Sequence, residues 1–224
     1  MKYIDKFLQK WRIAVVRPFI PHGSYVLDIG SADGVMFQLL YDRIEYGVGI
    51  DHSLSAPIVT ESYILLPGNF PQDLTQDTQR PYNIITALAV LEHIPPKDIG
   101  GFARACVKYL DPNGWLILTV PSPKVDKILW ALESLHIIDR MSLEEHFGFL
   151  VSQTPNLFES EGLTMVLHKK FQLSLNNLFI FSKSGKPIPQ KHNLTQSKLE
   201  ERFFLLASLW LIIIVILFAL FRFI

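Results

Sequence analysis

The residues best suited to chemistry lie where a short apolar run meets a turn with two glycines, in the segment VLDIGSADG. Residues 25–29 have the apolar pattern of a buried strand, and a helical pattern begins at Gly34. A glycine turn there lets the backbone approach a ligand, with the next helix N-terminus facing an anion. Asp28 stands two residues before the first glycine, where a carboxylate repels a pyrophosphate but attracts an ammonium group. The G-x-x-x-G spacing also differs from the dinucleotide-binding pattern.

A second carboxylate follows the next predicted strand, residues 46–50. Asp51 lies 23 residues after Asp28 and is followed by His52. An acid at the end of this strand is placed to accept hydrogen bonds from a ribose diol. A cofactor that has both an amino acid end and a ribose is S-adenosylmethionine. The two carboxylates therefore predict a site for this cofactor.

The elements that must position these residues alternate between strands and helices from residue 24 to residue 181. This alternation favours an α/β fold with a parallel sheet and helices on both faces. The expected strands are 25–29, 46–50, 63–66, 83–89 and 115–120, the expected helices are 34–42, 96–110, 123–138 and 154–161, a turn is expected at 111–114, and a closing hairpin joins 163–172 to 175–182.

Four segments of the sequence resemble the motifs of class I S-adenosylmethionine-dependent methyltransferases in order and spacing. They are VLDIGSADG, VGIDHS, YNIITALAVLEHIP and LDPNGWLILTVPSP. The likeness covers about residues 22–182 and is greatest to a small-molecule branch with a V-L-E-H-I motif. It implies a Rossmann-like, doubly wound sheet of seven strands in the order 3-2-1-4-5-7-6, with strand 7 antiparallel. It also implies transfer of a methyl group from S-adenosylmethionine, and no metal site is expected.

The resemblance carries roles over to particular positions. Asp28, Gly30, Ser31 and Gly34 would form the methionine-side loop, Asp51 would hold the ribose hydroxyls, His52, Asn69 and Phe70 would contact the adenine, and Leu88 would line the methionine end. His93 and His146 are candidate bases for the acceptor, since either ring could take a proton from an acceptor hydroxyl. A helix-capping role is the structural alternative for His93.

Two positions depart from the family pattern. Ala32 replaces the middle glycine of the usual G-x-G-x-G, and we expect a small loss because alanine holds most loop conformations without a positive φ. Asn83 replaces an aspartate that commonly opens the fourth strand, a residue that is usually structural. Neither change removes the two carboxylates on which the cofactor prediction depends.

The C-terminal part of the chain predicts a membrane anchor. Residues 203–221 hold 18 apolar residues out of 19, long enough for a helix to span a bilayer, and residues 183–202 read as a linker. A buried core helix is the alternative, but the segment is apolar on every side. Linker cations outnumber the single Arg222 beyond the span, so we expect a single-pass protein with its catalytic domain on the cytoplasmic side.

The N-terminal residues 1–21 predict an amphipathic helix. Its apolar stripe comprises Ile4, Phe7, Leu8, Trp11 and Val15. Packing on the domain is the favoured interpretation, and a lid over a ligand pocket or a helix resting on the membrane is the alternative.

Composition narrows the partners and the class of function. Lys and Arg total 21, as do Asp and Glu, so there is no global basic field to attract nucleic acid. We expect a methyl acceptor that is a quinone precursor, an isoprenoid, a lipid or a lipid-linked saccharide, with the bilayer as second partner. The alternatives are a methyltransferase acting on a membrane protein and a tethered cofactor-binding scaffold without turnover. The oligomeric state cannot be read from the sequence.

Overall fold

The computed structural model describes residues 3–122 and 149–188. The helices are α1 (Tyr3–Val16), α2 (Val35–Leu39), α3 (Ile99–Tyr109) and α5 (Thr154–Glu159), with 3₁₀ turns η1 (Arg17–Phe19), η2 (Gln76–Thr78), η3 (Leu91–His93) and η5 (Val151–Gln153). The strands are β1 (Ser24–Ile29), β2 (Ile44–Asp51), β3 (Ile58–Val59), β4 (Tyr63–Pro67), β5 (Tyr82–Leu88), β6 (Leu110–Pro121), β7 (Thr164–Phe171) and β8 (Asn176–Ser182).

One mixed sheet organises these elements, in the strand order β3-β4-β2-β1-β5-β6-β8-β7. Within the part of the chain that the structure describes, the sheet has eight strands and not the expected seven, because the two-residue β3 lies antiparallel to β4 at the sheet edge. From β4 to β6 neighbouring strands are parallel, whereas β8 runs antiparallel to both β6 and β7. The carboxyl ends of β1, β2, β4 and β5 therefore meet at one edge, where ligands bind in open α/β sheets.

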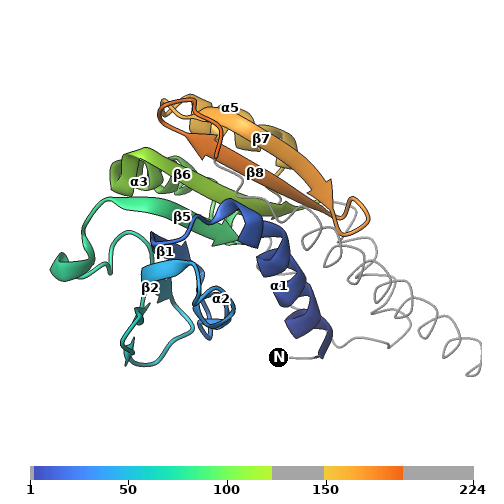
Figure 1. Ribbon diagram of the computed structural model, residues 1–224. Coiled ribbons are helices and arrows are strands. Elements are labelled where there is room, and N and C mark those ends of the chain that lie inside the picture. Colours follow the sequence, from blue (N-terminus) through green and yellow to red (C-terminus); the bar gives the residue numbers. More distant parts are fainter. Residues whose placement is uncertain (1–2, 123–148, 189–224) are drawn as a thin grey trace, which may run out of the picture.

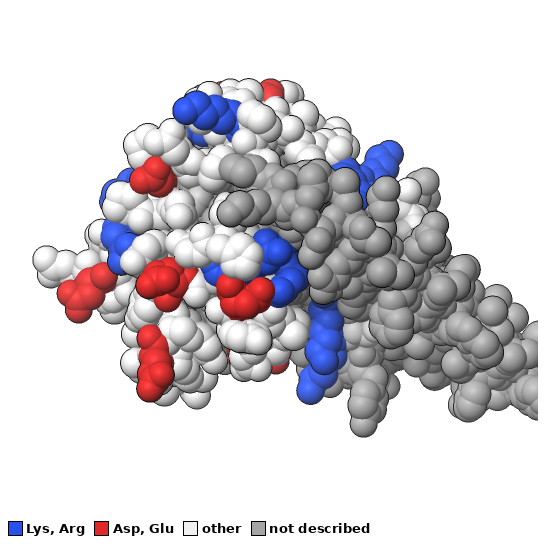
Figure 2. Space-filling view, viewed as in Figure 1, with Lys and Arg blue, Asp and Glu red and all other residues white. Residues whose placement is uncertain are grey.

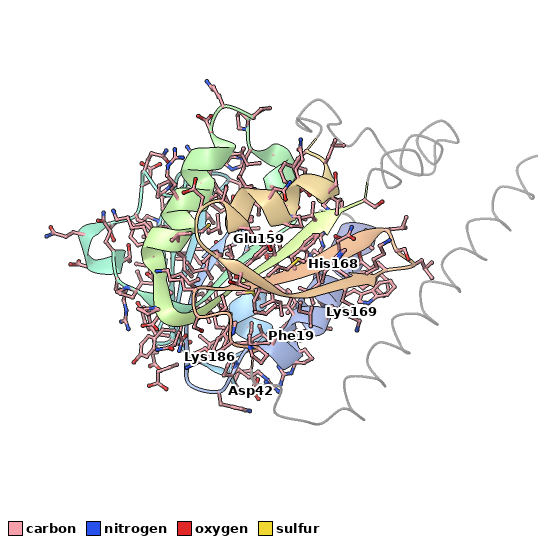
Figure 3. The ribbon with its side chains drawn as sticks, turned by 90° about the horizontal axis from the view of Figure 1, so that it is seen from above. Phe19, Asp42, Glu159, His168, Lys169 and Lys186 are labelled. Atoms are coloured by element: carbon pink, nitrogen blue, oxygen red, sulfur yellow. The ribbon has the colours of Figure 1, made fainter. Side chains whose placement is uncertain are left out.

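Helices cover both faces of the sheet, as a doubly wound fold requires. Figure 1 shows α1 in front of the strands, and the view from above in Figure 3 places α3 and α5 on the opposite side. The α3 side contains the larger apolar cluster, in which Phe158, Phe179 and Phe181 are fully covered and Cys106 is a buried core thiol. Alternate residues of each strand supply the two clusters, because successive side chains of a strand face opposite ways.

The α1 helix packs on the domain through its C-terminal half. Trp11, Ile13, Val15 and Val16 are buried and join a cluster with residues of the sheet. Burial of large side chains of this kind stabilises a domain by about 1.5–3 kcal/mol each. Packing on the domain, the favoured interpretation of this helix, is therefore confirmed.

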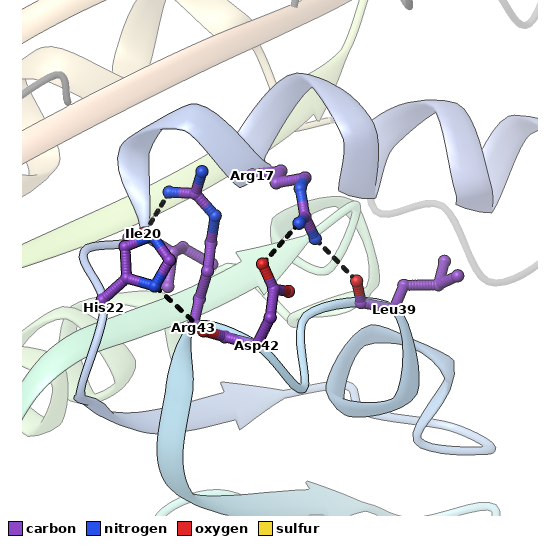
Figure 4. Close-up of polar contacts among 6 residues, drawn as sticks. All are labelled: Arg17, Ile20, His22, Leu39, Asp42 and Arg43. Atoms are coloured by element: carbon purple, nitrogen blue, oxygen red, sulfur yellow. Dashed lines mark hydrogen bonds and ion pairs between the residues drawn. The ribbon is translucent and has the colours of Figure 1, made fainter. Parts of the chain in front are cut away.

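Polar contacts fix the C-terminal end of this helix against the turn between α2 and β2 (Figure 4). Arg17 donates to a carboxylate oxygen of Asp42 at 2.7 Å and to the Leu39 carbonyl at 2.8 Å. Arg43, at the end of that turn, donates back to the Ile20 carbonyl, which follows α1, at 2.9 Å. These contacts hold the chain just after α1 against the turn that leads into β2.

Two expected elements differ from the structure. The turn at residues 111–114 lies within β6, which starts at Leu110; the register shifts there, and the Asn113 amide donates to the Asp111 carboxylate at 2.8 Å. The helix expected at 34–42 is only α2, because the chain turns back at Leu40 to enter β2.

The start of the predicted linker 183–202 is not a free spacer. Lys183 donates to the Leu110 carbonyl, the Trp115 indole donates to the Lys186 carbonyl at 3.1 Å, and Ile188 is buried with the α1-side cluster. The expected helix 123–138 and the predicted span 203–221 lie outside the described residues. Among those that are described, no helix has the length and apolar character needed to cross a bilayer.

Charged residues on the face shown in Figure 2 are mixed in sign, with acidic and basic side chains interspersed among neutral ones. This distribution agrees with the equal totals of the two charge types in the sequence. The described part of this face therefore presents no large area of a single sign.

Candidate functional site

A cavity of about 890 Å³ opens at the carboxyl ends of the parallel strands. Its wall is built from the ends of β1 and β2, the segment after β4, the segment after β5 and the first turns of α3. Six sequence-predicted residues line it: Gly30, Asp51, His52, Asn69, Phe70 and His93. The structure thus brings together positions that lie up to 63 residues apart in the chain.

The turn after β1 crosses the edge of this cavity with little side-chain bulk. Gly30 has a φ of 76°, and a Cβ atom added there would lie 2.6 Å from Val90 Cγ2. The Gly30 amide donates to the Ile50 carbonyl at 2.9 Å, which fastens the turn to β2. Gly34, with a φ of 71°, precedes α2, and its amide donates to the Ser31 carbonyl at 2.9 Å. At Gly30 the positive φ and the close approach of Val90 both favour a residue without a Cβ atom.

We expected Ala32 to adopt a backbone conformation without a positive φ, and the structure shows that this expectation is wrong. Its φ is 43°, in the left-handed region that costs L-residues roughly 1–2 kcal/mol. Ala89, which lines the cavity beyond β5, is also left-handed, with a φ of 60°. Strained backbone of this kind persists where the surroundings hold it, and it gathers at ligand sites. Ala89 lines the cavity itself, and the Ala32 amide donates to Asp51, which also lines it.

Asp51 ends β2 with its carboxylate held in place by the surrounding chain. One oxygen accepts from the Ser53 amide at 2.8 Å and from the Ser53 hydroxyl at 2.6 Å, and the other accepts from the Ala32 amide at 2.8 Å. Partial burial acts to raise the pKa of Asp51, but the Ser53 and Ala32 hydrogen bonds outweigh it and the pKa is lowered. This side chain is an ionised acceptor at the cavity wall.

Asp28 lies one layer deeper and is not among the cavity-lining residues. It is only 4% exposed, and its carboxyl accepts a 2.7 Å hydrogen bond from the Thr86 hydroxyl. Burial raises the pKa of Asp28 to about 7, against the lowering effect of the Thr86 bond, with a further contribution from the Asp51 charge. A cation bound above the turn would favour the ionised form.

The segment after β4 supplies the outer wall. Phe70 packs edge-on against Phe102 and Tyr109, with ring centroids 5.6 and 6.0 Å away. The exposed Asn69 is held by its backbone N–H, which donates to the Asp73 carboxylate at 2.7 Å. The wall that the family resemblance assigns to the adenine therefore carries an aromatic ring, which packs against two other rings.

Three other predicted residues lie away from the cavity wall. Ser31 is buried beneath the turn, Gly34 contacts Leu65, and Leu88 faces the α1 side at the end of β5. His146 lies outside the described residues. His52, by contrast, is an exposed lining residue whose ring nitrogen lies 3.9 Å from the Asp51 carboxylate.

The sequence argument missed several site residues. Thr86 contacts Asp28 across 58 positions, and Val90, just after β5, closes over Gly30, because β5 is the strand next to β1. No local pattern reveals such pairs, because strand order alone makes them neighbours. The Ser53 amide did have a signal, since an aspartate side chain commonly accepts a hydrogen bond from the backbone two residues on. Among the described residues, no group of three or more His, Cys, Asp or Glu side chains is placed to hold a metal ion.

Comparison with known proteins identifies the family. A family model described as "Methyltransferase domain" matches residues 2–170. The chain belongs to this methyltransferase family. The match includes every described residue of the cavity wall. The domain therefore has a methyltransferase fold, and its cofactor is S-adenosylmethionine.

Relatives and solved structures agree with this assignment. The ubiquinone biosynthesis O-methyltransferase of Nitrosomonas europaea is 24% identical over 149 residues, which is 62% of this chain and 63% of the relative. This chain thus matches less than two thirds of that relative's length. A Haloferax volcanii chain solved with the Trm112 methyltransferase activator superposes with a TM-score of 0.60 at 15% identity, over 80% of this chain and 91% of that one.

A third comparison concerns a structure with a ligand. The magnesium protoporphyrin IX methyltransferase of Synechocystis PCC 6803, solved with bound S-adenosylhomocysteine, has a TM-score of 0.56 at 13% identity, over 81% of this chain and 87% of that one. At these identities the likeness shows the fold alone. This chain's own residues fit the cofactor: Asp51 is ionised, the turn at Gly30 has no room for a Cβ, and Asp28 is buried beneath that turn.

Proposed function

We propose that the protein transfers a methyl group from S-adenosylmethionine to a small-molecule or lipid-like acceptor. A quinone precursor is the leading candidate, with an isoprenoid, a lipid or a lipid-linked saccharide as the others. The observation that carries the proposal is the pair Asp28 and Asp51 at the ends of adjacent parallel strands, one buried beneath the Gly30 turn and one ionised at the cavity wall. The name of the Nitrosomonas relative supports an oxygen acceptor on a quinone precursor.

The chain's residues have to bind, orient and exclude water, because the bound sulfonium supplies an already activated methyl group. The Asp51 oxygens accept from ribose hydroxyls, and Gly30 brings the backbone close to the amino acid end. Phe70 presents an aromatic ring to the adenine. Holding reactants in line can lower a barrier by about 7–11 kcal/mol without any covalent contribution from the protein. The His93 ring, at the cavity wall, is the candidate base for an acceptor hydroxyl.

We also propose that residues 203–221 span a membrane, with the domain on the cytoplasmic side. The support is the sequence: an apolar run of bilayer length, and cations concentrated on the domain side. A tether of this kind would keep the domain near a membrane-resident acceptor.

Calorimetry on the full chain in detergent tests the cofactor site. Asp51→Ala should weaken S-adenosylmethionine binding about tenfold to a hundredfold, because hydrogen bonds from ribose hydroxyls to a charged acceptor contribute about 1.5–3 kcal/mol. Asp51→Asn keeps the shape and isolates the charge. Asp77→Ala removes an exposed carboxylate away from the cavity and should bind like the parent protein. Equal affinity in all variants, or tighter binding of NAD than of S-adenosylmethionine, would contradict the proposal.

Membrane extraction tests the tail. The full chain should stay in the membrane fraction in high salt and in alkaline carbonate, because burial of an apolar span is insensitive to charge screening. A variant with two charged residues in the span, Ile213→Lys and Leu217→Lys, should appear in the supernatant instead. Release of the unmodified chain by carbonate would show that the segment does not span.

A further inference from the structure

The Thr86 hydroxyl, beneath the turn after β1, has three acceptors within reach and a single proton to donate. Its Oγ1 lies 2.7 Å from Asp28 Oδ1, 3.4 Å from the Leu27 carbonyl oxygen and 3.7 Å from the Met36 sulfur. A hydroxyl carries one donor proton and two acceptor lone pairs, and it rotates to suit its partners. Because a charged acceptor forms the shorter and stronger hydrogen bond, Asp28 takes this proton whenever its carboxylate is ionised.

The sheet holds Thr86 beside Asp28. β5 is the parallel neighbour of β1, and Thr86 stands directly opposite Asp28 in their register. The Thr86 side chain is fully covered and Asp28 is only 4% exposed. Threonine is stiff at χ1 because its Cβ is branched, so the hydroxyl keeps its place under the turn. In this buried setting the hydrogen bond between the two side chains is stronger than it would be in water.

The two carboxyl oxygens of Asp28 have different surroundings. Oδ1 accepts from Thr86, whereas Oδ2 accepts no hydrogen bond from any residue within 3–122 and 149–188. A carboxylate can accept several hydrogen bonds, and an ammonium group can only donate them. Anchoring Oδ1 therefore fixes the orientation of the carboxylate and leaves Oδ2 for the amino group of the cofactor.

The groups packed against Asp28 set the balance between its two protonation states. Burial raises the pKa of Asp28 to about 7, with a smaller contribution in the same direction from the Asp51 charge at the end of β2. β5 presents the Thr86 hydroxyl and α2 presents the Met36 thioether, and neither of these is charged. Of these influences on the Asp28 pKa, the Thr86 hydrogen bond is the one that favours the ionised form.

We propose that Thr86 is a positioning residue for the cofactor, and that its hydroxyl rotates as Asp28 gains or loses a proton. While Asp28 is protonated, its O–H donates to Thr86 Oγ1, and the Thr86 proton turns to the Leu27 carbonyl. On cofactor binding Asp28 releases its proton to solvent, and the Thr86 O–H turns back to donate to Oδ1. This assignment rests on the proposed role of Asp28 in cofactor binding and adds the residue that orients it.

Four variants of the full chain in detergent test the assignment, with S-adenosylhomocysteine as the probe in calorimetry from pH 6 to 8.5. Thr86→Val removes the hydroxyl at similar size, Thr86→Ala removes it without bulk, and Thr86→Ser retains it. Thr119→Val is the matched control, because Thr119 is equally covered on the neighbouring β6 but its hydroxyl has no hydrogen-bond partner among the described residues. Comparison of all variants at the same pH cancels the titration of the probe itself.

The expected result depends on pH. Loss of the donor disfavours ionised Asp28 more than protonated Asp28, so the rise of affinity with pH should move upward by about 0.5–1 pH unit. Thr86→Val and Thr86→Ala should therefore bind about threefold to tenfold more weakly than the parent protein at pH 6 and almost equally at pH 8.5. Thr86→Ser and Thr119→Val should follow the parent protein at every pH.

The contrary outcomes separate this assignment from the proposed function. Unchanged affinity of Thr86→Val and Thr86→Ala at pH 6 would overturn it. A loss of equal size at every pH, or one shared by Thr119→Val, would also overturn it, because the hydroxyl would then serve packing alone. Parent-like affinity of Asp28→Asn at every pH would remove the proposed role of Asp28 itself. Failure of the parent protein to bind the probe would instead contradict the methyltransferase function.

Discussion

Asp28→Asn should stabilise the ligand-free protein while it weakens cofactor binding. The raised pKa of about 7, against 3.8 for a free carboxyl, means that ionised Asp28 is disfavoured in the folded state. At pH 8 the neutral amide should raise the free energy of unfolding by about 2–4 kcal/mol. Asparagine is nearly the same size and can keep a hydrogen bond to Thr86. Thermal and denaturant unfolding measure the gain.

The pH dependence of this difference gives the sharper test. Below about pH 4 the carboxyl is protonated in both the folded and the unfolded chain, so the variant and the parent protein should be equally stable. Between about pH 4 and 7 the unfolded chain ionises while the folded chain keeps its proton, so the stability of the parent protein falls with rising pH; above pH 7 the difference is constant. A gap that is flat from pH 4 to 8 would show that Asp28 is not protonated in the fold.

Cofactor binding should show the opposite sign. An ammonium group favours ionised Asp28, so affinity of the parent protein for S-adenosylmethionine should rise with pH through 7 and be accompanied by proton release. Asp28→Asn should bind more weakly at pH 8 and lose this pH dependence. Calorimetry in two buffers of different ionisation enthalpy measures the released proton directly, and its absence would contradict the role of Asp28.

Gly30→Ala should destabilise the protein by about 2–4 kcal/mol. Part of the loss is the left-handed backbone, since a φ of 76° costs an alanine about 1–2 kcal/mol, and part is the close contact of the new Cβ with Val90. Adding Val90→Ala should recover the contact part but leave the backbone part. A double-mutant cycle in denaturant separates the two.

The cycle has a built-in control. Gly162 also has a positive φ, 87°, but an added Cβ there would contact nothing within 4 Å. Gly162→Ala should therefore show the backbone cost alone, and Val90→Ala should not relieve it. Strict additivity of Gly30→Ala and Val90→Ala would contradict the close contact between the two positions.

The sequence predicted the parts of this structure that depend on periodicity and on the ends of strands. Asp28 and Asp51 meet at one edge because parallel strands bring their carboxyl ends together, and this needs no knowledge of packing. It did not predict the burial of Asp28 against Thr86, which depends on β5 lying next to β1. Nor did it predict the left-handed Ala32, since alanine gives no signal of a strained φ. The extra strand β3 is two residues long, too short for any periodic pattern.

The contact of Trp115 with Lys186 shortens the linker between the domain and the proposed membrane span. With the chain held to the sheet as far as Ile188, only residues 189–202 separate the domain from the proposed span. Fourteen residues reach at most about 50 Å even when fully extended. On our proposal the catalytic domain therefore stays within a shallow layer next to the bilayer. Acceptors that diffuse laterally in the membrane come within its reach, whereas acceptors deep in the cytoplasm do not.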